Sequence, residues 1–120
     1  FPVAAKEKLV KKADGWALDI YVFSPRPLDD LLIEPNMPKL TLVVKAKECQ
    51  LAINDKAYVA ASQNRHEATY KELPLLQGWN KVSIKIGERD KNEFSGNFRC
   101  DNRNEFLSSL KVMFINPEAK

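Results

Sequence analysis

The segment from residue 75 to residue 86 constrains the fold more than any other part of the chain. Its second half alternates strictly: Val82, Ile84 and Ile86 are apolar, and the residues between them are serine or lysine. A period of two predicts a β-strand with one buried and one solvated face. Gly78 precedes this strand and supplies the backbone freedom of a tight turn, and Trp79 is a large aromatic at the sheet margin.

Length and charge exclude several classes of protein. A chain of 120 residues suits a single domain with one hydrophobic core, so we expect one module over residues 1–120. No apolar run approaches the roughly 20 residues needed to cross a bilayer, which argues against a membrane span. The net charge is only +3, and basic residues are interspersed with acidic ones. We therefore expect no nucleic-acid partner.

The first residue is not methionine, and we expect a module processed or cut from a larger protein. The two cysteines, Cys49 and Cys100, share a strand face with neighbouring apolar residues. They are either two buried thiols or one bridge between sheets. A bridge would close a loop of about 50 residues, would contribute about 3–4 kcal/mol and would imply secretion. Zinc-site spacing of cysteine and histidine is absent.

Further alternating stretches predict strands at 16–23, 39–47, 49–56, 94–100 and 110–116. We expect one antiparallel hairpin between 39–47 and 49–56, and another across the charged loop 87–93. Residues 7–12 fit either a helical turn or an irregular lead-in, and residues 28–34 fit either a short strand or a helical turn. Seven or eight short strands separated by polar turns indicate an all-β fold, an antiparallel two-sheet β-sandwich.

Several motifs then occur in a recognisable order. They are the strand Leu-Thr-Leu-Val-Val-Lys-Ala at 40–46, the turn Asn-Asp at 54–55, Gly-Trp-Asn at 78–80 before the alternating strand, and Phe-x-x-x-Phe-Arg at 94–99. This order resembles the galactose-binding-like jelly rolls attached to glycoside hydrolases and other polysaccharide-degrading enzymes, over roughly residues 39–115. One departure is Asp55, where the family's turn usually has glycine.

The resemblance implies a jelly-roll sandwich that is secreted and not catalytic. Such modules commonly bind carbohydrate, are sometimes pure scaffolds, and often hold a structural calcium. Asp29 and Asp30 are the acidic pair that could supply oxygen ligands, although no calcium-loop pattern is present. Otherwise we expect no cofactor.

Catalytic signatures are missing from the residues themselves. A nucleophile activated by histidine would have to use His66, and no Gly-x-Ser-x-Gly motif accompanies it. Glycine-rich phosphate loops are also absent. Among 16 acidic residues, chance pairs such as Glu88 with Asp90 are expected, so they do not indicate a glycosidase. We predict that the domain is not an enzyme.

Sugar binding requires a flat aromatic ring and polar side chains that satisfy hydroxyl groups. The residues of this kind that lie in or beside polar loops form the predicted site: Tyr58, Asn64, Arg65, His66, Tyr70, Trp79, Arg99, Asp101, Asn102 and Arg103. Each also has a plain structural interpretation. Trp79 and Trp16 are more often packing residues at a sandwich margin, and loop histidines and arginines are usually solvated surface.

Two functions remain. The first is a non-catalytic carbohydrate-binding module that targets an appended catalytic domain to polysaccharide, and the arginines would suit an acidic polysaccharide because a guanidinium grips a carboxylate or sulfate in two places. The second is a structural or interaction sandwich that serves as a spacer. A binding module should leave at least one tryptophan or tyrosine face exposed, whereas a spacer should bury them all.

Overall fold

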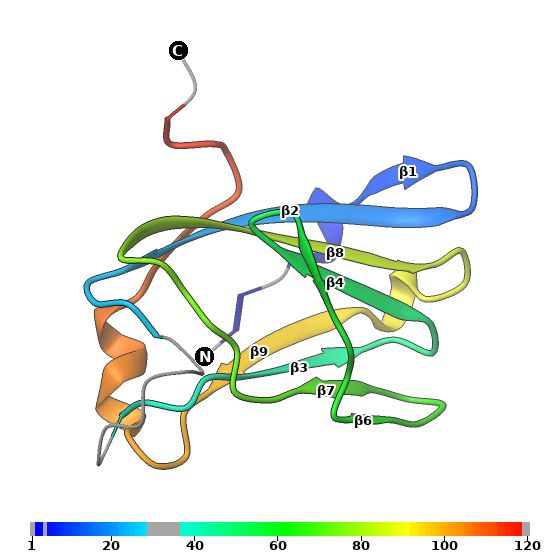
Figure 1. Cartoon of the computed structure of the whole chain (residues 1–120). Coiled ribbons are helices and arrows are strands. Elements are labelled where there is room, and N and C mark those ends of the chain that lie inside the picture. The colour runs from blue at the N-terminus through cyan, green and yellow to red at the C-terminus, as the bar shows by residue number, and fades with distance from the viewer. Residues whose placement is uncertain (1, 4, 29–36, 119–120) are drawn as a thin grey trace.

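The computed structural model describes residues 2–3, 5–28 and 37–118, and it is a sandwich of two antiparallel sheets (Figure 1). The larger sheet has the spatial order β1 (Val10–Lys12), β2 (Gly15–Ser24), β8 (Gly78–Gly87), β4 (Cys49–Ile53), β5 (Lys56–Tyr58), and β10 (Lys111–Met113) also pairs with β2. The smaller sheet has the order β6 (Ser62–Gln63), β7 (Ala68–Tyr70), β3 (Thr41–Lys45), β9 (Ser95–Arg99). Three short 3₁₀ segments complete the described elements: η1 (Lys6–Lys8), η2 (Lys91–Glu93) and η3 (Asn104–Ser109).

The predicted alternation of the strand after Gly78 is confirmed. Val82, Ile84 and Ile86 are buried, while the side chains between them are half-buried or exposed. Strand β2 follows the same rule, and the apolar faces of β2 and β8 pack against those of β3 and β9 in one hydrophobic core. The predicted all-β two-sheet sandwich is therefore correct. The jelly-roll connectivity stays a prediction.

The longest ladder joins β2 to β8 over ten residue pairs, from Gly15 opposite Gly87 to Ser24 opposite Gly78. Close approach at one end depends on glycine. A Cβ atom on Gly15 would lie 2.1 Å from the carbonyl oxygen of Ile86, so any larger residue would force the strands apart. Gly78, at the other end, has φ +96°, a left-handed conformation that glycine adopts without strain.

The hairpin predicted between 39–47 and 49–56 is wrong, and so is the hairpin predicted across 87–93. Strands β3 and β9 belong to the smaller sheet, whereas β4 and β8 belong to the larger one. Figure 1 shows both connections passing from one layer to the other at the same end of the sandwich. Alternation identifies the buried face of each strand, but both sheets bury a face in the same core, so it does not identify the partner strand.

The Asn-Asp turn at 54–55 joins β4 to β5 instead. Ile53 pairs with Lys56, so the loop has two residues, and their φ angles are 51° and 69°. Positive φ at both positions is the type I′ geometry that suits the twist of a tight hairpin. Asp55 therefore occupies a left-handed position that glycine would fill with less strain.

The structure decides between the alternatives left open for residues 7–12 and for the two cysteines, and in part for residues 28–34. Residues 7–12 contain the end of η1 and then β1, and Leu28 forms a bridge with Leu75, but residues 29–34 lie outside the described part of the chain. Both cysteines are free thiols. Cys49 begins β4 at the end where the sheets are joined by 46–48, and Cys100 follows β9 at the opposite end. The inter-sheet bridge is therefore not formed.

The side-chain amide of Asn80 connects the segment that leads into β8 with the β4–β5 turn. Asn80 is 1% exposed. Its Oδ1 accepts hydrogen bonds from the N–H of Leu76 and from Nδ2 of Asn54, both at 2.8 Å, and its Nδ2 donates to the carbonyls of Leu76 and Gly78 at 2.9 and 3.1 Å. Asn54 in turn accepts from the N–H of Lys81 at 2.9 Å. The Asn of the Gly-Trp-Asn motif thus holds the start of β8 to the β4–β5 turn.

Replacing Asn80 with alanine should remove this connection. We expect a loss of about 2–4 kcal/mol of unfolding free energy, because Asn54 and the backbone of 76–78 would lose buried partners. Chemical denaturation followed by tryptophan emission measures it. Asn92→Ala, at an exposed side chain, is the matched control and should cost less than about 0.5 kcal/mol. Equal midpoints for the two variants would contradict the assigned role.

Candidate functional site

The loop residues of the predicted site fall into two groups at opposite ends of the smaller sheet. Asn64, Arg65 and His66 lie in the β6–β7 connection, which adjoins the Val44 end of β3 through the pair Val44 and Ala68. The group 99–103 adjoins the other end of β3, where Thr41 pairs with Arg99. The two ends are separated by about 10 Å of extended strand. The fold therefore does not bring Arg65 together with Arg99 and Arg103.

Several of these polar side chains already stabilise local structure. Asn64 Oδ1 accepts hydrogen bonds from the N–H groups of His66 and Glu67 and so shapes its own loop. Asn102 accepts a hydrogen bond from the N–H of Lys39 and donates one to the carbonyl of Met37. These bonds hold the segment that precedes β3 in place.

The two arginines at the η3 end have carboxylate partners. Arg99 pairs with Asp101 at 2.8 Å, and Arg103 pairs with Glu105. The hydrogen bond from Arg103 lowers the pKa of Glu105. The binding role of all these loop residues stays a prediction.

The predicted aromatic residues differ in exposure. Tyr70 is 2% exposed, so its ring belongs to the core, and its hydroxyl donates to the carbonyl of Cys49 at 3.4 Å. Burial raises the pKa of Tyr70. Tyr58 is half-buried with its ring toward the core, and the Lys56 ammonium lies 5.6 Å from its centre. Trp79 is half-buried on the opposite, solvent-facing side of the larger sheet.

That solvent-facing side carries an organised row of side chains. The register places Asp19 opposite Ser83, Tyr21 opposite Lys81, and Phe23 opposite Trp79, all on the face away from the core. We call this set, together with Lys85, the outer strip: Asp19, Tyr21, Phe23, Trp79, Lys81, Ser83 and Lys85. It combines three half-buried aromatic rings with carboxylate, hydroxyl and ammonium groups.

The aromatic end of the outer strip is fixed by ring contacts. The rings of Phe23 and Trp79 meet edge to face, with centroids 5.4 Å apart and planes at 67°. Lys111 of β10 places its ammonium 5.6 Å from the Phe23 ring, and Met113 on the same strand is 41% exposed. Phe23 and Tyr21 were not among the predicted site residues. Their outward parity is readable in the alternation of 16–23, but only the β2–β8 pairing shows that they adjoin Trp79.

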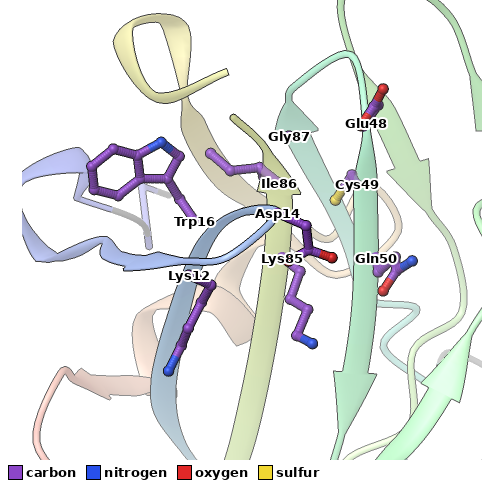
Figure 2. A pocket seen from close by; sticks show the side chains of 9 residues that line it. All are labelled: Lys12, Asp14, Trp16, Glu48, Cys49, Gln50, Lys85, Ile86 and Gly87. Carbon is purple, nitrogen blue, oxygen red and sulfur yellow. The ribbon is translucent and has the colours of Figure 1, made fainter. Parts of the chain in front are cut away.

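A small hollow lies at the other end of the same two strands (Figure 2). Its lining consists of Lys12, Asp14, Trp16, Glu48, Cys49, Gln50, Lys85, Ile86 and Gly87. Figure 2 shows Lys12 and Lys85 extending in one direction along the sheet, and the indole of Trp16 extending away from them. The pair Gly15 and Gly87 contributes no side chains at this level of the ladder. Lys85 belongs to both the hollow and the outer strip.

Trp16 is held at the rim of the hollow by its own contacts. Its Nε1 donates to the carbonyl of Glu88 at 3.1 Å. The ammonium groups of Lys91 and Lys11 lie 4.1 and 5.4 Å from its ring, at cation–π distances. The indole therefore has two cationic neighbours at its ring, which would compete with a sugar for that ring.

Asp90 forms hydrogen bonds with the backbone of two residues that line the hollow, Glu48 and Gly87. Its carboxylate accepts hydrogen bonds from the N–H groups of Lys47, Glu48 and Gly87 at 2.9, 3.1 and 2.9 Å. It thus ties the β3–β4 crossover to the end of β8. Because three backbone N–H groups bind its carboxylate, Asp90 is a structural residue. It lies in the charged loop 87–93.

The described residues contain no cluster of side chains that could bind a metal ion. Within residues 2–3, 5–28 and 37–118, no three residues among His, Cys, Asp and Glu are grouped so as to hold a metal ion. The acidic pair Asp29 and Asp30, named for calcium, lies outside those ranges. In the same described residues, no helix is long and apolar enough to cross a membrane.

The thiol of Cys49 should react slowly in the native protein. Burial raises its pKa and is the largest effect; the Tyr70 hydrogen bond lowers the pKa by less, and the nearby Asp90 charge adds the smallest effect, an increase. Because a raised pKa leaves less thiolate at neutral pH, alkylation by iodoacetamide at pH 7.5 (roughly a unit below an ordinary cysteine pKa) should be slower than for a free cysteine.

Mass spectrometry of the intact chain measures this reaction. We expect two alkylations after unfolding without any reductant, since both thiols are free. Single variants Cys49→Ala and Cys100→Ala assign each rate. Alkylation that required prior reduction would reveal a disulfide, and rapid native reaction of Cys49 would contradict its raised pKa.

Comparison with protein-family models, with curated proteins and with solved structures found no match.

Proposed function

We propose that this domain is a non-catalytic carbohydrate-binding module that targets an appended catalytic domain to polysaccharide. One observation carries the proposal: half-buried rings of Tyr21, Phe23 and Trp79 stand on a solvent-facing sheet beside Lys81, Ser83 and Asp19. The residues proposed to contact the sugar are those of the outer strip, with the polar lining of the hollow as a second contact region.

The chemistry of a sugar suits such a surface. Each pyranose ring has an apolar face that packs on an aromatic ring, and an equatorial girdle of hydroxyl groups that need both donors and acceptors. Tyr21, Ser83 and Lys81 supply donors, and Asp19 supplies an acceptor. An antiparallel pair of strands holds these groups in fixed spacing, so few of them must be ordered on binding.

The role in targeting follows from effective concentration. A domain that holds a polysaccharide keeps a tethered partner near its substrate and raises the local concentration without chemistry of its own. Such a module would act on extracellular material, which accords with the expectation of a secreted protein.

The alternative is a structural or interaction spacer without sugar affinity. Tyr70 in the core and the lysines at the ring of Trp16 are the observations that favour it. The position of Trp79 favours the binding module. Its half-buried indole lies on the solvent face with the rings of Tyr21 and Phe23, and a spacer has no need of three aromatic rings there.

Polysaccharide binding is tested by affinity gel electrophoresis and tryptophan emission over a panel of neutral and acidic polysaccharides. We expect retardation by at least one polymer, and a loss of affinity of about tenfold or more in Trp79→Ala, which corresponds to about 1.4 kcal/mol. The affinity of this variant is measured by affinity gels and not by emission, because the variant lacks the indole at the proposed site and retains only Trp16.

Arg65→Ala is the matched control, because it changes the exposed loop at the far sheet. It should leave the affinity unchanged. Loss of binding in Arg65→Ala with retention in Trp79→Ala would return the site to the loops. The absence of any retardation and any emission change across the panel would reject the binding module in favour of the spacer. Denaturation midpoints verify that both variants fold.

A further inference from the structure

We infer that the ligand of the outer strip is an acidic linear polysaccharide, with its carboxylate or sulfate groups on Lys81 and Lys85 of β8. This inference rests on the proposed function and narrows it to one class of carbohydrate. The positions of charged and small side chains on the solvent face of the larger sheet carry it.

The lysines of that face flank its central strands. Lys81 and Lys85 are four residues apart on β8, so they project on the same side about 13 Å from each other. Lys111 on β10 and Lys12 on β1 lie across β2 from β8, at the levels of Phe23 and Gly15. A polymer that lies along β8 would meet two cations on that strand and one further lysine beside its path at each end.

Acidic side chains are few along the strands themselves. The strands present four lysines on the solvent face and one acid, Asp19. The other acids near this face lie in turns at its margins: Asp14 and Glu48 at the hollow, and Asp55 beyond Lys81. The strands of this face therefore carry more positive than negative charge, although Asp19 lies between the levels of Lys81 and Lys85 and the margins are mixed.

The contact between Lys81 and Asp55 does not occupy the lysine. Their charged atoms are 3.9 Å apart, and the two side chains are 40% and 87% exposed. Exposed pairs of this kind contribute little to stability, so a ligand carboxylate could replace Asp55 at small cost. Lys85 is exposed. No ion pair is recorded for it among the described residues.

Small side chains lie between the lysines. Ser83 stands between Lys81 and Lys85 on β8, and its neighbours across the ladders are Ala52 on β4 and Asp19 on β2. Ala17 is the β2 neighbour of Lys85. A polymer can therefore approach the sheet closely between its two cationic contacts, while the rings at the Phe23 end receive a sugar face.

The arginines first considered for an acidic sugar are less suited to it. Arg99 is already paired with Asp101 and Arg103 with Glu105, and Arg65 lies at the opposite end of β3. Lys81 and Lys85, by contrast, lie on the same face of one strand, so an extended anionic chain along that strand could contact both.

The decisive comparison uses polymers that differ only in charge. The acidic probes are polygalacturonate and dextran sulfate, and their neutral counterparts are fully methyl-esterified polygalacturonate and dextran. We expect the wild-type chain to bind at least one acidic probe about tenfold more tightly than its neutral counterpart, and to weaken as salt is raised.

The matched variants remove two charges each. Lys81→Gln with Lys85→Gln should weaken acidic binding by about tenfold. Lys45→Gln with Lys71→Gln, at exposed positions on and beside the smaller sheet, makes the same change in net charge and should weaken it less than about twofold. Unchanged binding in the first pair, or equal losses in both pairs, would overturn the inference.

The remaining outcomes separate this inference from the proposed function. Neutral polymers bound as tightly as acidic ones, with loss in Trp79→Ala, would leave the carbohydrate module standing and remove the acidic ligand. Polyglutamate or single-stranded DNA bound as tightly as the acidic polysaccharides would indicate a nonspecific cationic surface and overturn the inference. If none of these polymers bound, the acidic ligand would be rejected, and the proposed function would fail with it only if the wider polysaccharide panel also gave no binding.

Discussion

The buried amide of Asn80 is the interaction on which the rest of the larger sheet depends. A buried amide must find both donors and acceptors, since an unpaired one would cost about 1–3 kcal/mol. Here the partners come from the segment before β8 and from the β4–β5 turn. Satisfying one side chain therefore fixes where β8 begins and how β4 lies against it. A shift of one residue in that register would turn the outer strip toward the core.

The opposite end of β8 is fixed by a different chemistry. There the three backbone N–H groups bound by Asp90 join the crossover from β3 to the last residue of the strand, and Gly15 permits β2 to approach Ile86. A neutral amide at one end and a carboxylate at the other hold the strand between them. The outer strip lies on this doubly anchored segment, which suits a surface whose side chains must keep a fixed spacing.

Local pattern predicted the strands well, because burial follows the parity of each residue. Val82, Ile84 and Ile86 are buried as their alternation requires, and Asn54 and Asp55 form the predicted turn. Sheet membership was not predictable in the same way. The connection at 46–48 could have been a hairpin, but it crosses between layers, and there Asp90, more than 40 residues away in the chain, binds the N–H groups of Lys47 and Glu48.

The site was less predictable than the fold for the same reason. Trp79 was identified from its motif, but its neighbours Tyr21 and Phe23 come from a strand more than 50 residues earlier, and only the ladder brings them together. Tyr70 lies on a strand of three residues, too short for alternation to reveal that its ring points into the core. The loops around Arg65 and Arg99 are both polar in sequence, yet β3 separates them.

The pairing of β2 has a consequence for the order in which this chain can fold. One edge of β2 pairs with β1, which is adjacent in sequence, and also with β10, which follows roughly 90 residues later, while the other edge pairs with β8. The longest ladder therefore closes large loops, and such contacts form slowly because their chain entropy is lost before any burial is gained. During synthesis one edge of β2 stays unpaired until β8 has emerged. Among the described strands, β1 is the partner of β2 that is nearest in sequence, which makes residues 10–24 a natural place for structure to begin.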